Sequence, residues 1–252
     1  MIEPRALLYA TLAGAGATAL GASTVLALPK LSHRSHDTLL GFSAGLMGGI
    51  VGLQLLPEAI RTSQGQSPIV IFGLVLGVIA LMGLDRAARW LPTPEPFRRG
   101  ASNMQRAPTG FLVFLALSVH NIPEGLSTGL GYGRGVTSFG HAVALAVALQ
   151  NIPEGLIVAV PLRGEGHSRW AAFAWAAATG MIEPIFSLIA MMAIDFSAVI
   201  LPGGLGFAAG AMVYVVVAEM IPESWKHGYH REATMAAAGG ILIVALLSLL
   251  AD

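Results

Sequence analysis

The chain has 252 residues, of which 55% are hydrophobic and only 11% are charged, and its formal net charge is zero. A soluble domain carries about 25% charged residues, so the composition excludes a water-soluble globular protein and indicates an all-α integral membrane protein. The absence of cysteine excludes disulfides, thiolate metal sites and a catalytic thiol. No basic run is dense enough to bind nucleic acid.

Eight segments of the chain are long and apolar enough to cross a membrane as helices. The first follows "MIEPR" and is expected to be a retained span rather than a cleaved signal peptide. Because the connections are short, we expect one transmembrane domain, residues 1–252. The predicted spans are residues 6–28, 38–57, 68–90, 108–131, 139–162, 170–194, 199–222 and 232–250.

The Lys and Arg residues predict how the spans are oriented. The connections after the first, third, fifth and seventh spans, with the adjoining helix ends, hold eleven of them, whereas the opposite face holds three. Cytoplasmic connections are enriched in Lys and Arg, so both termini are predicted to lie outside the cytoplasm. The longest connection, 91–108, is then cytoplasmic, and its Pro-rich, basic sequence predicts a mobile loop.

Two repeated patterns describe how the spans pack. Glycines at four-residue spacing let helix backbones approach closely; they are Gly41, Gly45 and Gly49, then Gly73 and Gly77, then Gly206 and Gly210. A weaker pattern places "LLPEA" (55–59) at the end of the second span and "MIPES" (220–224) at the end of the seventh, which runs in the opposite direction. Inverted repeats of this kind are typical of transporters.

Four glutamates, Glu124, Glu154, Glu183 and Glu219, lie within predicted spans that contain no Lys or Arg. An ionised side chain at bilayer depth costs at least about 3 kcal/mol. The counter-charge must therefore come from protons or from a bound metal cation. Glu183 lies in "TGMIEPIF" (179–186), whereas Glu219 lies nearer the cytoplasmic end, where its side chain can reach water.

The sequence Asn-Ile-Pro-Glu-Gly occurs twice, and the spacing of its polar residues predicts a metal site. His120 with Glu124, and Gln150 with Glu154, are four residues apart and share a helix face. The prolines within the motifs each remove one backbone hydrogen bond and free a carbonyl. Imidazole, carboxylate and amide oxygen suit zinc, iron(II), manganese or cadmium, whereas the lack of thiolates argues against copper(I).

The other histidines fall at the ends of the predicted spans. His141 begins the fifth span on the outer side, where it is a candidate to meet incoming ions. The remainder lie on predicted cytoplasmic connections and are interpreted as solvated: His33, His36, His167, His227 and His230.

At these motifs the chain resembles the ZIP (Zrt-/Irt-like) divalent-metal transporters, and closely their GufA-like branch. The resemblance implies an eight-helix bundle, arranged three plus two plus three, with a two-metal site between the fourth and fifth helices. The matching segments are "GFSAGLM" (41–47), "HNIPEGLSTG" (120–129), "QNIPEGLIVAVPL" (150–162), "TGMIEPIFSL" (179–188) and "AEMIPES" (218–224).

The resemblance also implies which residues bind each ion. The first metal would take His120, Glu124, Gln150 and Glu154, with Met47 adding a thioether. The second would take Asn121, Asn151 and Glu183, with Glu124 and Glu154 as bridges, and Glu219 would lie on the exit route.

The chain departs from the family pattern at three places. Many eukaryotic members carry a His-Glu-x-Pro-His-Glu motif in the fifth span, and this chain has Gln150, Asn151 and Glu154 at its first, second and fifth positions. Ala218 stands where some relatives have a histidine beside Glu219, which weakens the case for a further site there. The connection 91–108 contains no histidine, so a metal-sensing role should not be transferred to it.

We therefore expect a carrier of divalent transition metal, zinc foremost and iron, manganese, cadmium or cobalt as alternatives, that works without an organic cofactor. No nucleotide-binding motif is present, so transport should run downhill, into the cytoplasm as in the family. We expect alternating access, with a simple channel as the alternative. Three ionised site carboxylates would carry a charge of −3, which one divalent ion changes to −1 and two change to +1. Without metal, at least one of these carboxylates should hold a proton, so metal uptake should release protons. The partners are metal ions and the bilayer; the sequence leaves a homodimer open. Compact loops favour a prokaryotic inner membrane by analogy.

Two other classes of protein remain as alternatives. A membrane-embedded metallohydrolase would hold zinc on His120 and Glu124 and use Glu154 as the base. The HExxH pattern is absent, which argues against an enzyme. A purely structural membrane protein would leave the unpaired acids unexplained.

Overall fold

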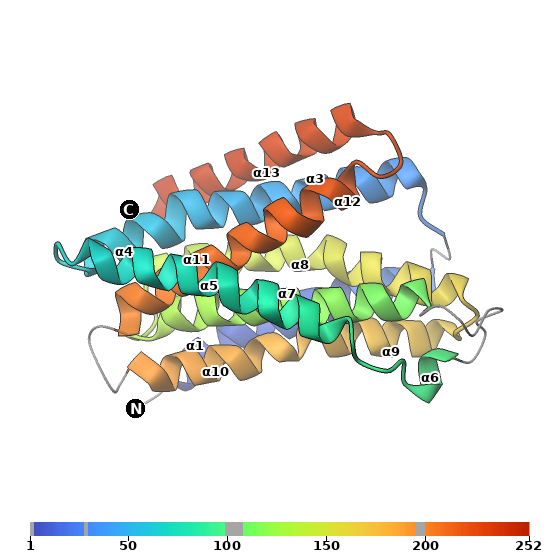
Figure 1. Ribbon diagram of the computed structural model, residues 1–252, viewed down its shortest axis with the longest axis horizontal. Helices are drawn as coiled ribbons and strands as arrows, with labels where there is room; N and C mark the ends of the chain where they lie inside the picture. The colour runs from blue at the N-terminus through green and yellow to red at the C-terminus, as the bar shows by residue number, and fades with distance from the viewer. Residues whose placement is uncertain (1–2, 28–29, 99–107, 195–199, 252) are drawn as a thin grey trace.

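The computed structural model describes residues 3–27, 30–98, 108–194 and 200–251. Within these ranges the secondary structure is helical and no strand is present, which confirms the expected all-α class. The long helices run roughly along one axis of the bundle (Figure 1). The start of α1 and the end of α13 lie at one end of the bundle, and α6 lies at the other.

Several of the spans are interrupted by short turns of a different helical type. The first comprises α1 (Pro4–Thr11), the π-helical η1 (Leu12–Gly16), α2 (Ala17–Ser23) and the 3-10 turn η2 (Thr24–Leu26). The second comprises α3 (His33–Gly49), the π-helical η3 (Ile50–Leu55) and α4 (Leu56–Thr62). The third is α5 (Ser67–Ala88), which α6 (Glu95–Arg98) follows.

The second half of the chain begins with two uninterrupted helices, α7 (Thr109–Tyr132) and α8 (Ser138–Gly164). The next two spans are each divided. They comprise α9 (Arg169–Gly180) with α10 (Ile182–Ile194), then α11 (Ile200–Val215), the π-helical η4 (Val216–Met220) and α12 (Ile221–Ser224). The last helix is α13 (His230–Ala251).

Seven helical segments among the described residues are long and apolar enough to cross a membrane. They correspond to seven of the eight predicted spans. The remaining one, the fourth predicted span (108–131), coincides with α7, a helix of 24 residues that is not among the seven. Its polar residues His120, Asn121 and Glu124 lower its mean hydropathy, and they are also its candidate metal ligands.

The helices pack in pairs that obey one exchange rule. α3 packs on α13 and α5 on α11, while α2 packs on α8 and α10 on α7. Suppose that the first, second and third spans change places with the sixth, seventh and eighth, and α7 with α8. The pair of α3 and α13 then becomes the pair of α11 and α5, and the pair of α2 and α8 becomes the pair of α10 and α7. Two of the π-helical turns, η3 and η4, follow the same rule, because they lie in exchanged spans and each ends two residues before the proline of a Pro-Glu segment, at 57–58 and 222–223. The third, η1, has no counterpart among the described residues of the sixth span.

The glycine rows lie at the closest helix contacts, as predicted. A Cβ on Gly45 would collide with the carbonyl of Ala237 in α13, and one on Gly77 with the carbonyl of Phe207 in α11. Any side chain at these positions would force the helices apart, so glycine sets the distance between them.

The connection predicted to be a mobile loop is anchored in its first part. Phe97 in α6 is only 2% exposed and its ring packs near those of Phe111, Phe114 and Trp175. The prediction is therefore wrong for α6, because one aromatic side chain buried among others holds this turn against the bundle. Residues 99–107 of the same connection lie outside the described residues.

Candidate metal centre

The two Asn-Ile-Pro-Glu-Gly motifs lie in α7 and α8, which pack against each other. Both helices continue through their prolines, Pro123 and Pro153, without a break. The candidate ligands of the two motifs, together with Glu183 in the first turn of α10, are all at most 4% exposed. They are His120, Asn121, Glu124, Gln150, Asn151, Glu154 and Glu183.

Gln150 joins the carboxylates of the two helices. Its Nε2 donates to Glu124 Oε1 at 2.6 Å and to Glu154 Oε1 at 3.1 Å. The hydroxyl of Ser43 in α3 donates to the Gln150 backbone carbonyl at 3.4 Å. Met47 is buried and lies four residues after Ser43, on the same face of α3. Met47 therefore shares the face of α3 that contacts α8 through Ser43, and its role as a ligand stays a prediction.

Asn151 joins three spans at the other proposed ion position. Its Nδ2 donates to Glu183 Oε1 at 2.9 Å and to the carbonyl oxygen of Ala13 in η1 at 3.1 Å. The next residue of η1, Gly14, leaves room for the glutamate, because a Cβ there would lie 2.7 Å from Glu183 Oε2. Asn121 is held differently: its Nδ2 donates to the Thr179 carbonyl of α9 at 2.8 Å.

His120 contacts the residue that the sequence placed on the exit route. Its Nε2 lies 2.8 Å from Oε2 of Glu219, which η4 carries. The Glu219 side chain is 15% exposed, compared with 5% for that of His120. Glu219 thus connects the buried centre to a less buried position on the seventh span.

Six candidate ligands keep one buried atom without a hydrogen-bond partner among the described residues. These atoms are His120 Nδ1, Asn121 Oδ1, Glu124 Oε2, Gln150 Oε1, Asn151 Oδ1 and Glu154 Oε2. Leaving a buried polar atom unpaired costs about 1–3 kcal/mol. Every one of the six can present a lone pair, since the Nε2 proton of His120 can serve the bond to Glu219. Cations would satisfy all of them at once.

The carboxylates of Glu124, Glu154 and Glu183 lie close enough to repel one another. In the part of the chain that the structure describes, none of them forms an ion pair with Lys or Arg. The chain therefore gathers negative charge at this point and supplies no fixed positive charge to balance it.

Several contributors to the centre escaped sequence reasoning. The carbonyls of Ala13 and Thr179 hold the two asparagine amides, and a backbone group gives no signal in a sequence. Outside the set of predicted ligands, Gln54 in η3 is 3% exposed and both its amide atoms lack a hydrogen-bond partner among the described residues. As a polar residue inside a predicted span, it did carry a signal. His141, the candidate outer residue, accepts from or donates to the Tyr132 hydroxyl at 2.9 Å.

Comparison with known proteins agrees with the resemblance seen in the motifs. The sequence pattern of the family described as "ZIP Zinc transporter" matches residues 97–248. "Zinc transporter GufA" of Myxococcus xanthus is 36% identical over 96% of this chain and 97% of its own length. "Zinc transporter ZIPB" of Bordetella bronchiseptica is 36% identical over 95% and 80%, and "Zinc transporter ZIP11" of Xenopus tropicalis is 44% identical over 61% and 46%. The chain therefore belongs to the ZIP family, in its GufA-like branch.

Proposed function

We propose that this protein transports divalent transition-metal ions, zinc foremost, across a membrane into the cytoplasm. The observation that carries the proposal is a set of six buried ligand atoms without a hydrogen-bond partner among the described residues, gathered with three carboxylates that form no ion pair with a described Lys or Arg. A resident positive side chain would trap these acids in a fixed pair. A mobile cation satisfies them only while it is bound, which is what a carrier requires.

The centre divides into two ion positions. The first uses His120, Glu124, Gln150 and Glu154, of which the last three already share hydrogen bonds. The second uses Asn121, Asn151 and Glu183, with Glu124 and Glu154 shared between the positions. Because two ligands of the second position are neutral amides, the first position binds its ion more tightly.

The proposed orientation identifies the end of the path that faces the cytoplasm, and transport toward that end is the direction that the family resemblance implies. Eight spans, arranged three plus two plus three as an inverted repeat, place both termini outside the cytoplasm when Lys and Arg mark the inner side. The exchange rule among the helix pairs supports this arrangement. Glu219, in contact with His120, then receives the ion on its way out of the centre.

The metallohydrolase alternative gains no support from the relatives, which are named as transporters. Transport explains the same ligands without requiring a place for a substrate carbonyl.

The test is zinc flux into sealed vesicles that contain only this protein. We expect saturable uptake by the wild-type chain and none by Glu154→Gln, which keeps the shape of the side chain and removes its charge. An exposed amide variant, Gln66→Ala, is the matched control and should transport normally. Uptake that is identical in wild-type and Glu154→Gln vesicles would contradict the proposal. Competition by iron, manganese, cadmium and cobalt would then rank the metals.

A further inference from the structure

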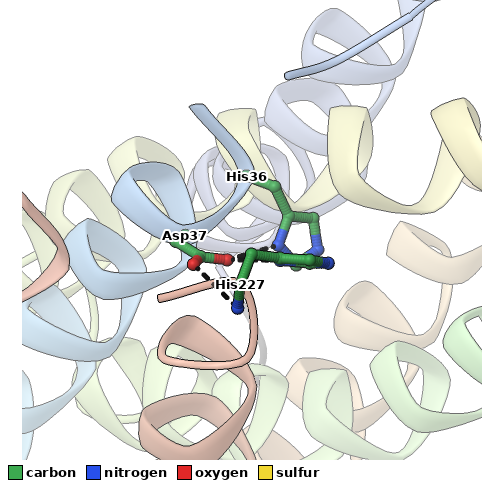
Figure 2. A group of neighbouring side chains, drawn as sticks. All are labelled: His36, Asp37 and His227. Carbon is green, nitrogen blue, oxygen red and sulfur yellow. Dashed lines mark hydrogen bonds and ion pairs between the residues drawn. The ribbon is translucent and has the colours of Figure 1, made fainter. Parts of the chain in front are cut away.

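A second group of metal-binding side chains lies away from the centre, where α3 begins. His36 and Asp37 belong to the first turn and a half of α3, and His227 lies in the turn between α12 and α13 (Figure 2). The sequence interpretation of these histidines as solvated residues omits the aspartate at which the rings of His36 and His227 point, although both rings are partly exposed. The interpretation is wrong for His167, which is 9% exposed.

One oxygen of the buried Asp37 carboxylate faces both rings. Oδ1 lies 2.7 Å from His227 Nδ1 and 3.3 Å from His36 Nδ1. The other oxygen, Oδ2, accepts the backbone N–H of His227 at 3.2 Å. The carboxylate is therefore oriented by the main chain, and its free oxygen is turned toward two imidazole nitrogens. Such support of a ligating group is typical of metal sites.

The distances suit a small cation. All three ligand atoms lie within 4.8 Å of one another. Ligands at about 2.0–2.2 Å from a tetrahedral zinc ion lie about 3.4 Å apart, so the His36–Asp37 separation already fits. The His227–Asp37 separation must widen by well under 1 Å, which the replacement of a hydrogen bond by an ion would do.

Access and protonation also permit binding. The Asp37 side chain is 0% exposed, whereas those of His36 and His227 are 19% and 24% exposed. Water can thus reach the rings and fill an open coordination position. To bind an ion, each ring moves its proton from Nδ1 to Nε2. His33 stacks on His227, with ring centroids 4.1 Å apart, and limits the motion of that ring.

We propose that His36, Asp37 and His227 form a third binding site for a divalent transition metal, of the zinc class, separate from the centre between α7 and α8. The ion would fasten the turn after α12 to the start of α3, and it would replace hydrogen bonds that span 190 residues of sequence. The cluster lies at the same end of the bundle as α6 (Figure 1). In the proposed orientation this end is cytoplasmic, so the site meets metal that has already been delivered.

The test is cobalt(II) binding to the full chain in detergent, with the number of bound ions measured by equilibrium dialysis and tetrahedral cobalt by its visible absorption. We expect His36→Gln and His227→Gln to weaken one binding event by at least about tenfold and to remove the tetrahedral bands. His230→Gln, an exposed histidine outside the cluster, is the control and should change neither. Both cluster histidines are partly exposed, so these variants should fold, as Asp37→Asn need not.

The same measurements in a Glu154→Gln background separate this site from the transport centre. The tetrahedral bands should persist there and still depend on His36 and His227. If Glu154→Gln leaves metal binding and transport unchanged, the proposed transport centre is contradicted. The proposal for the cluster does not depend on that result, because His36→Gln and His227→Gln test it separately. The proposal would be overturned if His36→Gln and His227→Gln bound cobalt as His230→Gln does. The three residues would then only hold the turn after α12 to α3 by hydrogen bonds.

Discussion

Replacement of Asn151 by alanine tests how the second ion position is held together. The side chain makes two hydrogen bonds, to Glu183 and to the Ala13 carbonyl, and presents one unpartnered oxygen. A hydrogen bond to a charged group contributes about 1.5–3 kcal/mol. Since about 1.4 kcal/mol is a tenfold change in affinity, Asn151→Ala should weaken the second position by about 10- to 150-fold.

The expected phenotype is a rise in the zinc KM with transport retained at high zinc. Loss of Asn151 leaves the four ligands of the first position and both bridging carboxylates in place. Glu154→Gln, in contrast, removes a charge that both positions share, and it should abolish flux at any zinc concentration. The two variants should therefore differ in kind, since one shifts the concentration dependence and the other removes the activity.

The assay is initial uptake into vesicles over a range of zinc concentrations, corrected for the amount of protein inserted. Gln66→Ala, which removes an exposed amide, controls for the substitution itself. Equal losses from Asn151→Ala and Glu154→Gln would refute the division into a tighter and a weaker position. A silent Asn151→Ala would show that its amide holds Glu183 without contributing to ion binding.

Four further outcomes are expected. At subsaturating zinc, uptake should fall as the pH drops from about 7.5 to about 5.5, because carboxylates must lose protons to bind metal; a flat profile would contradict proton release. Gly45→Ala should lower the thermal midpoint in detergent by overpacking against Ala237, at a cost of about 1–3 kcal/mol. Gly14→Ala should displace the Glu183 carboxylate and raise the zinc KM without loss of folded protein. Gln54→Leu should slow uptake although it fills the same buried space, and unchanged kinetics would exclude Gln54 from the ion path.

The sequence predicted the parts of the fold that depend on local composition and spacing. Apolar length located the spans, and glycine spacing located the closest helix contacts, because both properties act along a single helix. The hydropathy rule is least suited to α7, where His120, Asn121 and Glu124 make one helix both a span and part of the metal centre. Apolar length still placed this segment among the eight predicted spans, and the repeated motif marked it as part of the metal site.

What the sequence did not predict depends on contacts between distant segments. The carbonyl of Ala13 and the amide of Asn151 are 138 residues apart, and a main-chain acceptor has no characteristic residue type. His227 and Asp37 are 190 residues apart, and neither belongs to a repeated motif. Histidines on connections look solvated in a sequence, and only the packing of α12 on α3 brings these groups together.

Gln54 and Glu219 differ in charge although they lie at equivalent positions of the proposed inverted repeat. Alignment of Pro57 with Pro222 places Gln54 and Glu219 at equivalent positions, each in the π-helical turn before its Pro-Glu segment. Gln54 is a buried neutral amide without a hydrogen-bond partner in the part of the chain that the structure describes, whereas Glu219 is a partly exposed carboxylate bonded to His120. Charged ligands hold a divalent cation more strongly than amides do, and on the proposed orientation the carboxylate lies on the cytoplasmic side. An ion that leaves the centre is therefore attracted inward by a charge that has no counterpart on the outer side.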